Sequence, residues 1–277
     1  NAIHIATEGP LGIAARRWCI KNDIGFTTSY HTQFPEYLRL RAPIPLRVSY
    51  AWLRHFHSKA VRTLVPTQSQ KNRLIAHGFY NVTVWGRGVD SSVFTTNNPV
   101  DLKLKRPVLM NMGRVAIEKN IEAFLNLNID GSKVVIGDGP DLQQLKEKYP
   151  QVTFTGAKFG KELAAHLAAA DVFVFPSKTD TFGLVLLEAM ACGLPIAAYP
   201  VTGPLDVVKN GVTGYMNEEL STAVIKALSL SSKGCVDYAQ SHSWEACSSV
   251  FAANMFDNTK QPKTEDSHII NQSFWCL

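Results

Sequence analysis

The 277-residue sequence lacks the features of membrane-spanning, disulfide-bonded and disordered proteins. It contains no run of 18 or more apolar residues, so no membrane-spanning helix is predicted. Its five cysteines are scattered, without a Cys-x-x-Cys pair or a histidine cluster at zinc spacing. This argues against a disulfide framework or a structural metal and fits a reducing cytosol. With 45% hydrophobic and 18% charged residues, the chain is expected to bury ordinary cores.

The sequence also lacks an N-terminal signal pattern, and its first residue is Asn1 rather than Met. The next residues, Ala2-Ile3-His4-Ile5-Ala6, are typical of a buried strand. A domain that starts inside a sheet suggests that upstream sequence is missing. We therefore expect the chain to be N-terminally incomplete.

Positive charge is in excess, with a formal net charge of +5, and much of it lies between Arg39 and Arg62. Such a basic face attracts phosphates, nucleic acid or an anionic membrane surface, and it is equally typical of a solvated helix. Tyr50, Trp52 and Phe56 are interleaved with these cations, so we hypothesise that the stretch faces anionic lipid or a lipid acceptor. The basic residues lack a stacking-aromatic pattern, and no nucleic-acid partner is expected.

Short β-rich segments alternate with helical patterns, which predicts an α/β protein with parallel sheets. In the first part we expect strands at 3–6, 26–29, 63–66 and 82–84, and helices at 12–21, on much of 35–57 and at 69–76. The polar segment 94–106 holds a proline and is predicted to be a linker.

The second part has the more regular alternation of a doubly wound sheet, whose ligands bind at the carboxyl ends of the strands. Strands are expected at 108–112, 133–136, 152–155, 172–175 and 196–198. Helices are expected at 118–125, 141–149, 160–169, 183–192, 220–228 and 244–256.

A polar loop with Asp180 connects the strand at 172–175 to an apolar helix that contains Glu188. The start of this helix is expected at the carboxyl edge of the sheet, where free N–H groups and the helix dipole favour a phosphate or a sugar oxygen. Asp180 also fits a simple N-cap. Glu188 needs a partner if it is buried, because an isolated charge is costly in an apolar environment.

Two cations, Arg114 and Lys119, frame the loop after the strand that ends at Gly113. At a strand's carboxyl edge they suit a diphosphate, with arginine making a forked contact and lysine acting as a point charge. The alternative is a pair of exposed cations, with Lys119 paired to Glu118 or Glu122.

Two other strand ends give weaker signals. A Gly-x-Gly turn at 137–139 lets a ligand approach the backbone, but Leu142 stands where a dinucleotide fingerprint has its third glycine, which argues against a dehydrogenase. His31 follows a strand directly and is expected at the rim of a cleft. A lone histidine is nevertheless more often structural than catalytic.

These features, in this order, resemble the family 4 retaining glycosyltransferases, which have the GT-B architecture. The resemblance runs from Ala2 to Phe256, and its parts are the E-x7-E-like segment 175–195, Gly113-Arg114 with Glu118-Lys119, and Arg87-Gly88-Val89-Asp90 followed by Phe94. Ser29-Tyr30-His31-Thr32 with Phe34-Pro35 and Tyr37 is similar to the branch of sulfoquinovosyl-, diacylglycerol- and mannosyltransferases. GDP-mannose-dependent α-mannosyltransferases are the most similar within it.

The resemblance implies an α/β chain with two Rossmann-like doubly wound domains that face a cleft. Residues 1–97 would form a truncated acceptor-side domain and residues 98–240 the donor-binding domain. A helix at 241–257 would pack back on the N-terminal domain, and the tail at 258–277 is unassigned.

The resemblance also implies residue roles. Arg114 and Lys119 would bind the donor diphosphate and stabilise the charge that develops on it, Asp180 would hold hydroxyls of the sugar, and Glu188 would accept hydrogen bonds from the ribose. His31 would lie across the cleft, near the sugar and the acceptor. The expected catalytic residues are thus His31, Arg114, Lys119 and Asp180. The other donor-binding residues are Gly113, Gly137, Asp138, Gly139, Pro140, Thr181, Phe182, Gly183, Leu184 and Glu188.

The implied reaction is retaining transfer of a hexosyl group, mannose favoured, from GDP-mannose or a UDP-sugar to a lipid or saccharide acceptor. A front-face mechanism needs no pair of carboxylate nucleophiles. No cofactor and no metal are expected, because Arg114, Lys119 and the helix end supply positive charge. The implied location is the cytoplasm, including the inner face of the cell membrane.

Two alternatives remain: a GT-B nucleotide-sugar epimerase and a non-catalytic nucleotide-binding module. The second gains weight from the truncation, because the glycine-rich loop that follows the family's first strand has no counterpart in this chain. A separate departure is Asp180, which stands where most members have Glu and would bear on sugar choice.

Overall fold

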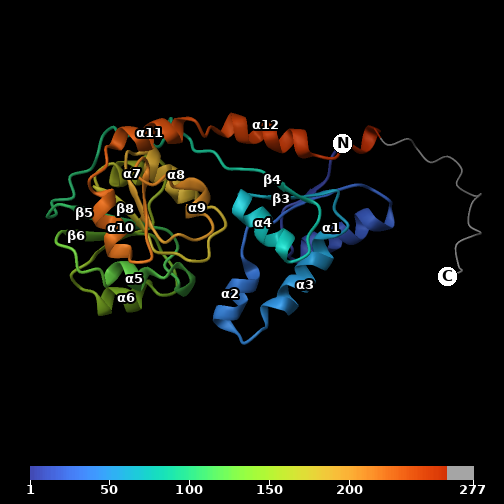
Figure 1. The fold of residues 1–277 in the computed structure, drawn as a ribbon, viewed down its shortest axis with the longest axis horizontal. Helices are drawn as coiled ribbons and strands as arrows, with labels where there is room; N and C mark the ends of the chain where they lie inside the picture. Colours follow the sequence, from blue (N-terminus) through green and yellow to red (C-terminus); the bar gives the residue numbers. More distant parts are fainter. Residues whose placement is uncertain (261–277) are drawn as a thin grey trace, which may run out of the picture.

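The computed structural model describes residues 1–260, which form two α/β lobes (Figure 1). The first lobe has a parallel sheet in the order β1-β2-β3-β4. Its strands are β1 (His4–Ile5), β2 (Thr27–Ser29), β3 (Arg62–Val65) and β4 (Val82–Val84). The connecting helices are α1 (Pro10–Lys21), α2 (Phe34–Arg41), α3 (Leu46–His57) and α4 (Gln68–Ala76).

The second lobe has a parallel six-stranded sheet in the order β10-β9-β8-β5-β6-β7. Its strands are β5 (Val108–Met112), β6 (Ser132–Ile136), β7 (Thr153–Gly156), β8 (Val172–Phe175), β9 (Ile196–Ala198) and β10 (Gly214–Met216). The helical segments are η1 (Ile117–Lys119), α5 (Ile121–Leu125), α6 (Leu142–Lys148), α7 (Gly160–Leu167), α8 (Leu184–Ala191), α9 (Pro204–Val207), α10 (Leu220–Ala227) and α11 (Ser232–Gln240). The strand order reverses between β5 and β8, the position where open α/β sheets bind ligands.

Both faces of the second sheet are buried, as its apolar strands require. Met110, Phe173 and Ile196 belong to one core cluster, and Leu109 and Val174 belong to the cluster on the other face. The prediction of parallel α/β sheets is confirmed. Every predicted strand is present, and its ends differ from the prediction by at most one residue.

Several helical segments differ from the prediction, for local reasons. The helix expected over 35–57 is two helices, α2 and α3, because Pro43 and Pro45 lie between them. The helix expected over 118–125 is broken at Asn120, whose φ of 52° is left-handed. Three elements of the second lobe were not predicted: α9, α11 and β10.

The predicted linker, 94–106, has no helix or strand, yet it is attached to the second lobe. Phe94, Leu102 and Leu104 pack against the core of that lobe, and the Val100 N–H donates to the carbonyl of Ala165 at 3.1 Å. The segment therefore lies along the second lobe instead of spanning freely between the two.

The last long helix, α12 (Trp244–Asn254), leaves the second lobe and lies against the first (Figure 1). The Trp85 indole N–H donates to the carbonyl of Cys247 at 3.0 Å, and the rings of Trp85 and Phe251 are 4.6 Å apart. Val89 forms a bridge with Ser243 at the start of the helix. The chain thus crosses between the lobes twice, once at each end of the second lobe.

The short segment η2 (Asn258–Lys260) ends the described part of the chain, so Cys276 and the tail beyond residue 260 lie outside it. Cys19, Cys192, Cys235 and Cys247 are buried free thiols. Within residues 1–260, no helix has the length and apolar character needed to cross a bilayer.

The close approach of α12 to Gly88 yields a stability prediction. A Cβ at Gly88 would lie 2.6 Å from backbone atoms of Ser243 and Trp244, whereas a Cβ at Gly86 would meet nothing within 4 Å. We expect Gly88→Ala to lower the free energy of unfolding by about 1–3 kcal/mol, since the helix must shift. Gly86→Ala, the matched control, should change it by less than about 0.5 kcal/mol. Urea unfolding measures both, and equal stabilities would contradict the described packing.

Candidate functional site

A cavity of about 620 Å³ lies between the lobes, where strands β2 and β4 of the first lobe and β5 and β8 of the second end. Its volume suits a ligand of nucleotide size. Residues of both lobes and the start of α12 line it, among them His31, Trp85, Arg87, Gly113, Arg114, Lys119, Asp180, Thr181, Phe182, Gly183, Leu184, Val185 and Trp244.

An ion pair between Lys119 and Asp180 joins the two main loops of the second lobe. The Nζ of Lys119 lies 2.6 Å from Oδ1 of Asp180, and both side chains are largely buried. Asp180 Oδ2 is also buried and has no hydrogen-bond partner among residues 1–260. Lys119 thus pairs with Asp180 rather than with Glu118 or Glu122. The N-cap of α8 is Gly183, so the N-cap interpretation of Asp180 is wrong.

Glu118 forms a second charged group beside this pair. Its carboxylate is buried and lies 2.7 Å from Arg41 of α2 and 3.5 Å from Arg114. The Arg114 side chain is 61% exposed and lines the cavity, so its guanidinium keeps donors free for a ligand. Because Arg41 belongs to the first lobe, Glu118 also connects the lobes.

The loops after β2 and β8 touch across the cleft. The Thr181 hydroxyl donates to the carbonyl of His31 at 2.7 Å, and the Gln33 amide donates to the carbonyl of Asp180 at 3.0 Å. Gln33 is buried, so its bond to the Asp180 carbonyl has little contact with water. The backbone that carries Asp180 is therefore fixed by the first lobe.

His31 is held as a neutral imidazole at the cavity wall. Burial, and then the charge of Arg87 and the proximity of His4, lower its pKa to about 4. Its Nδ1 lies 2.6 Å from Nη2 of Arg87, which can only donate, so Nδ1 accepts. The ring hydrogen then sits on Nε2. Trp85 supports the arrangement, with its ring edge-on to His31 and 4.2 Å from the Arg87 guanidinium.

The first turn of helix α8 lies at the cavity and is preceded by Gly183, whose backbone is left-handed. Gly183 has φ 77°, and a Cβ there would lie 3.2 Å or less from Leu186 and Phe175. Only glycine takes this conformation without strain. Leu184 and Val185 follow as the first helical residues, and their N–H groups have no partner within the helix. This is the geometry that binds anions at helix ends.

Two predicted groups do not line this cavity: Glu188 and the turn at 137–140. Glu188 lies one turn further along α8, where burial raises its pKa. The turn's glycines have a packing reason. A Cβ at Gly137 would lie 1.9 Å from the carbonyl oxygen of Gly113, and one at Gly139 would lie 2.2 Å from that of Val115. The turn therefore supports the Arg114 loop directly.

Several lining residues were not predicted as site residues, and three of them lie outside the loops that were predicted: Trp85, Arg87 and Trp244. Arg87 opens the Arg-Gly-Val-Asp stretch that carried part of the family resemblance, and it follows the end of β4. Its position after a strand was the available signal. No such signal pointed to Trp244, because it lines the cavity only as a result of α12 returning to the first lobe.

Two family models match the chain in succession. The model described as Glycosyltransferase Family 4 matches residues 1–93, and the model described as Glycosyl transferases group 1 matches residues 106–230. The boundary between them falls in the segment that joins the lobes.

Curated relatives include the GDP-mannose-dependent alpha-mannosyltransferases of Mycobacterium tuberculosis (33% identity) and Mycolicibacterium smegmatis (40%). Each alignment covers 78% of this chain and 60% of the relative, so the chain spans about 60% of the length of these proteins. The sulfoquinovosyl transferase SQD2 of Arabidopsis thaliana is 33% identical, over 78% of this chain and 46% of the relative.

Similar solved structures include Anabaena HepE in complex with UDP-glucose, with a TM-score of 0.71, 17% identity, and coverage of 90% of this chain and 77% of that one. Sucrose-phosphate synthase from Thermosynechococcus elongatus has a TM-score of 0.71 and 21% identity, over 91% and 74% of the two chains. At these identities the likeness concerns the fold. Together with the family models and the relatives, it shows that the chain belongs to the family 4 glycosyltransferases and has their GT-B fold of two facing parallel-sheet lobes.

Proposed function

We propose that the protein is a retaining glycosyltransferase that moves a hexosyl group, mannose favoured, from a nucleotide-sugar to a lipid or saccharide acceptor. The observation that carries the proposal is the Lys119–Asp180 ion pair beside the first turn of α8. It places a cation and a carboxylate side by side in a cavity that already has a positive helix end. A nucleotide-sugar presents the complementary groups, a diphosphate next to a polyhydroxyl ring.

In this proposal the donor exchanges one set of partners for another. The diphosphate takes Lys119, Arg114 and the N–H groups at the start of α8, all of which can stabilise the charge on the leaving phosphate. Asp180 is then released to accept hydrogen bonds from sugar hydroxyls. Glu188 lies beyond the described cavity on the same helix, and we keep it as the partner of the ribose.

The front-face mechanism and the absence of a metal requirement are also proposals. They rest on the same residues, because two cations and a helix end already supply positive charge at the diphosphate. His31 carries its hydrogen on Nε2 and is neutral, so it can donate a hydrogen bond to the sugar or the acceptor. Transfer is preferred to epimerisation because Arg114, Lys119, Asp180 and the start of α8 suit a diphosphate next to a sugar, and because the named relatives are transferases.

Mannose is favoured by the names of the mannosyltransferase relatives, and UDP-glucose is named with the solved HepE structure. GDP-mannose and UDP-sugars therefore both remain candidate donors. We propose that the reaction takes place in the cytoplasm or at the inner face of the cell membrane.

The lipid-facing hypothesis needs a correction. Tyr50 and Phe56 are buried in the core of the first lobe and cannot face lipid. Trp52 is 49% exposed and Val48 is 55% exposed on α3, next to the exposed Arg47. Leu38 and Leu40 are exposed on α2, with Arg39. We therefore propose that an anionic membrane surface meets the α2–α3 pair through these residues.

The first prediction concerns donor use. Lys119→Ala should lower kcat/KM for the donor at least 100-fold, since removing one electrostatic donor to a developing charge costs about 3 kcal/mol. Glu188→Ala should also weaken donor use severely. Lys178→Ala, an exposed lysine in the same loop as Asp180, is the matched control and should behave as wild type. Transfer of radiolabelled sugar, measured in EDTA, provides the test, and near-normal transfer by Lys119→Ala would reject the site.

The second prediction concerns pH. The charge of Arg87 helps to hold the pKa of His31 near 4, so Arg87→Gln should raise that pKa toward 6.5. As pH falls, His31 then becomes protonated earlier, and the acid limb of kcat/KM moves to higher pH. NMR titration of the His31 ring follows the same event directly. Arg54→Gln on α3 is the control cation, and an unchanged His31 titration in Arg87→Gln would refute the assignment.

The third prediction concerns the membrane surface. The chain should co-sediment with anionic liposomes in low salt and stay in the supernatant with neutral ones, because neutral lipid does not attract the cations. Low salt is used because salt screens this attraction. Arg47→Glu should reduce the bound fraction. Lys146→Glu, the same charge change on α6 of the second lobe, should not. Equal recovery with anionic and neutral liposomes would end this proposal.

A further inference from the structure

A second cavity, of about 570 Å³, lies within the first lobe between the β1–α1 loop and the helices α2 and α3. We name it the α2–α3 pocket. Its walls are apolar and are formed by Phe34, Pro35, Leu38, Val48, Trp52 and Leu53. The exposed Thr7 also lines it, and two further lining side chains, Glu8 and Ser49, are polar and buried.

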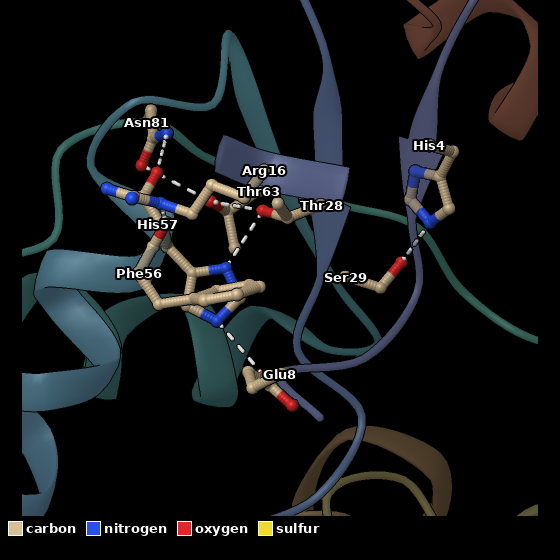
Figure 2. Close-up of polar contacts among 9 residues, drawn as sticks. All are labelled: His4, Glu8, Arg16, Thr28, Ser29, Phe56, His57, Thr63 and Asn81. Carbon is tan, nitrogen blue, oxygen red and sulfur yellow. Dashed lines mark hydrogen bonds and ion pairs between the residues drawn. The ribbon is translucent and has the colours of Figure 1, made fainter. Parts of the chain in front are cut away.

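Glu8 is only 7% exposed and is held by a buried histidine. Its Oε1 lies 3.1 Å from Nε2 of His57, which is 1% exposed (Figure 2). Among residues 1–260, this is the only hydrogen bond of its carboxyl group. Gly12 makes the arrangement possible, because a Cβ there would lie 1.9 Å from the carbonyl oxygen of Thr7. Helix α1 can thus pack closely on the loop that carries Glu8.

The network behind His57 fixes where its hydrogen atoms are. Asn81 donates through Nδ2 to the carbonyls of His57 and Ala60, so its Oδ1 is the acceptor for the Thr63 hydroxyl at 3.4 Å. Thr63 must then accept from the Thr28 hydroxyl at 3.1 Å, and Thr28 must accept from Nδ1–H of His57 at 2.8 Å. Figure 2 shows this chain running from the ring to Asn81.

The direction of the chain leaves Oε2 of Glu8 available to a ligand. With Nδ1 of His57 donating to Thr28, Nε2 contacts Oε1 of Glu8, and Oε2 has no hydrogen bond among residues 1–260. Oε2 can accept a hydrogen bond. The pocket is therefore suited to a donor such as a hydroxyl group.

Ser49 adds the complementary group. Its hydroxyl is buried and has no hydrogen-bond partner among residues 1–260, although buried hydroxyls normally have one. A ligand hydroxyl that donates to Glu8 can accept from Ser49. An alcohol meets both requirements, whereas an ether or an ammonium group meets only one.

The pocket lies close to the cavity between the lobes. A third cavity, of about 520 Å³, has Phe34 and Leu38 in common with the α2–α3 pocket. It has Arg114 and Lys119 in common with the cavity between the lobes. A single intervening cavity therefore lies between the α2–α3 pocket and the cavity of the proposed donor.

We propose that the α2–α3 pocket binds an amphiphilic alcohol as the acceptor, with its apolar chain against α2 and α3 and one hydroxyl hydrogen-bonded to Glu8 and Ser49. This rests on the proposed function in one respect, the role of the bound alcohol as acceptor. Glu8 and Ser49 bind the ligand, and His57, with Thr28, Thr63 and Asn81, positions Glu8.

The test uses 1-decanol and its methyl ether, titrated into the full chain by calorimetry. Wild type should bind the alcohol about tenfold more tightly than the ether, as expected for one hydrogen bond to a charged or strongly polar group. Glu8→Met should remove this preference. Glu8→Gln should keep it, because its amide can donate to His57 and leave its oxygen toward the pocket. A fluorescence change on binding that is lost in Trp52→Phe places the ligand in the pocket.

Ser49→Ala is a second test variant that is expected to remain folded. It removes an unsatisfied buried hydroxyl, so the melting temperature should be unchanged or higher while affinity for 1-decanol falls several-fold. Equal affinity of alcohol and ether in wild type, or an unchanged preference in Glu8→Met, overturns the proposal, as does no binding by folded wild type. Titration with GDP-mannose and UDP-glucose is the separate arm: donor binding without alcohol binding leaves the proposed function standing, and the reverse result rejects that function alone.

Discussion

The site depends on the two hydrogen bonds that join the loop after β2 to the loop after β8. Through them the first lobe holds the backbone of Asp180 and Thr181, while Lys119 of the second lobe holds the Asp180 carboxylate. Neither lobe alone can place this carboxylate. The cavity between the lobes is thus a joint product of two sheets that meet at their carboxyl edges, as open parallel sheets do when they bind ligands.

The two segments that connect the lobes keep the carboxyl edges of the two sheets facing each other. The segment 94–106 packs on the second lobe, and α12 returns to the first, where Trp85 receives it. Trp85 also contacts His31 and the Arg87 guanidinium in the cavity wall. The same indole therefore supports the docking of α12 and the orientation of a site histidine, which links a stability feature to the chemistry of the cleft.

Much of this could be predicted from the sequence, because strands with apolar, β-branched residues are bounded by clear turn residues. The carboxyl ends of parallel strands meet at one edge, so the positions of Arg114, Lys119 and Asp180 along the chain placed them at the same edge of one sheet. The family resemblance added His31 from the other lobe. Short elements were missed for physical reasons. Helix α11 contains Gly234 and buries few residues, and β10 begins with Gly214, a residue that is depleted in strands.

Contacts between distant segments were beyond sequence reasoning. The partner of Lys119 lies 61 residues away, and the partner of Glu118 on α2 lies 77 residues away. Spacing rules consider neighbours on one helix, so they offered Glu118 and Glu122 for Lys119. Likewise, the aromatic pattern of α3 did not reveal which rings face inward. Tyr50 and Phe56 complete the core, and Trp52 alone of the three is left at the surface.

The Lys119–Asp180 pair has a consequence for the end of the reaction cycle. In the proposed function, a nucleotide-sugar would satisfy both members at once, the lysine through its phosphates and the aspartate through its ring hydroxyls. The nucleoside diphosphate that remains after transfer would satisfy only the lysine, and it would leave a largely buried carboxylate without a counter-charge. Re-formation of the Lys119–Asp180 ion pair removes that penalty. We therefore expect the Asp180 carboxylate to compete with the nucleoside diphosphate for Lys119. The Asp180 carboxylate, which is negatively charged like the phosphate, would then favour release of the product.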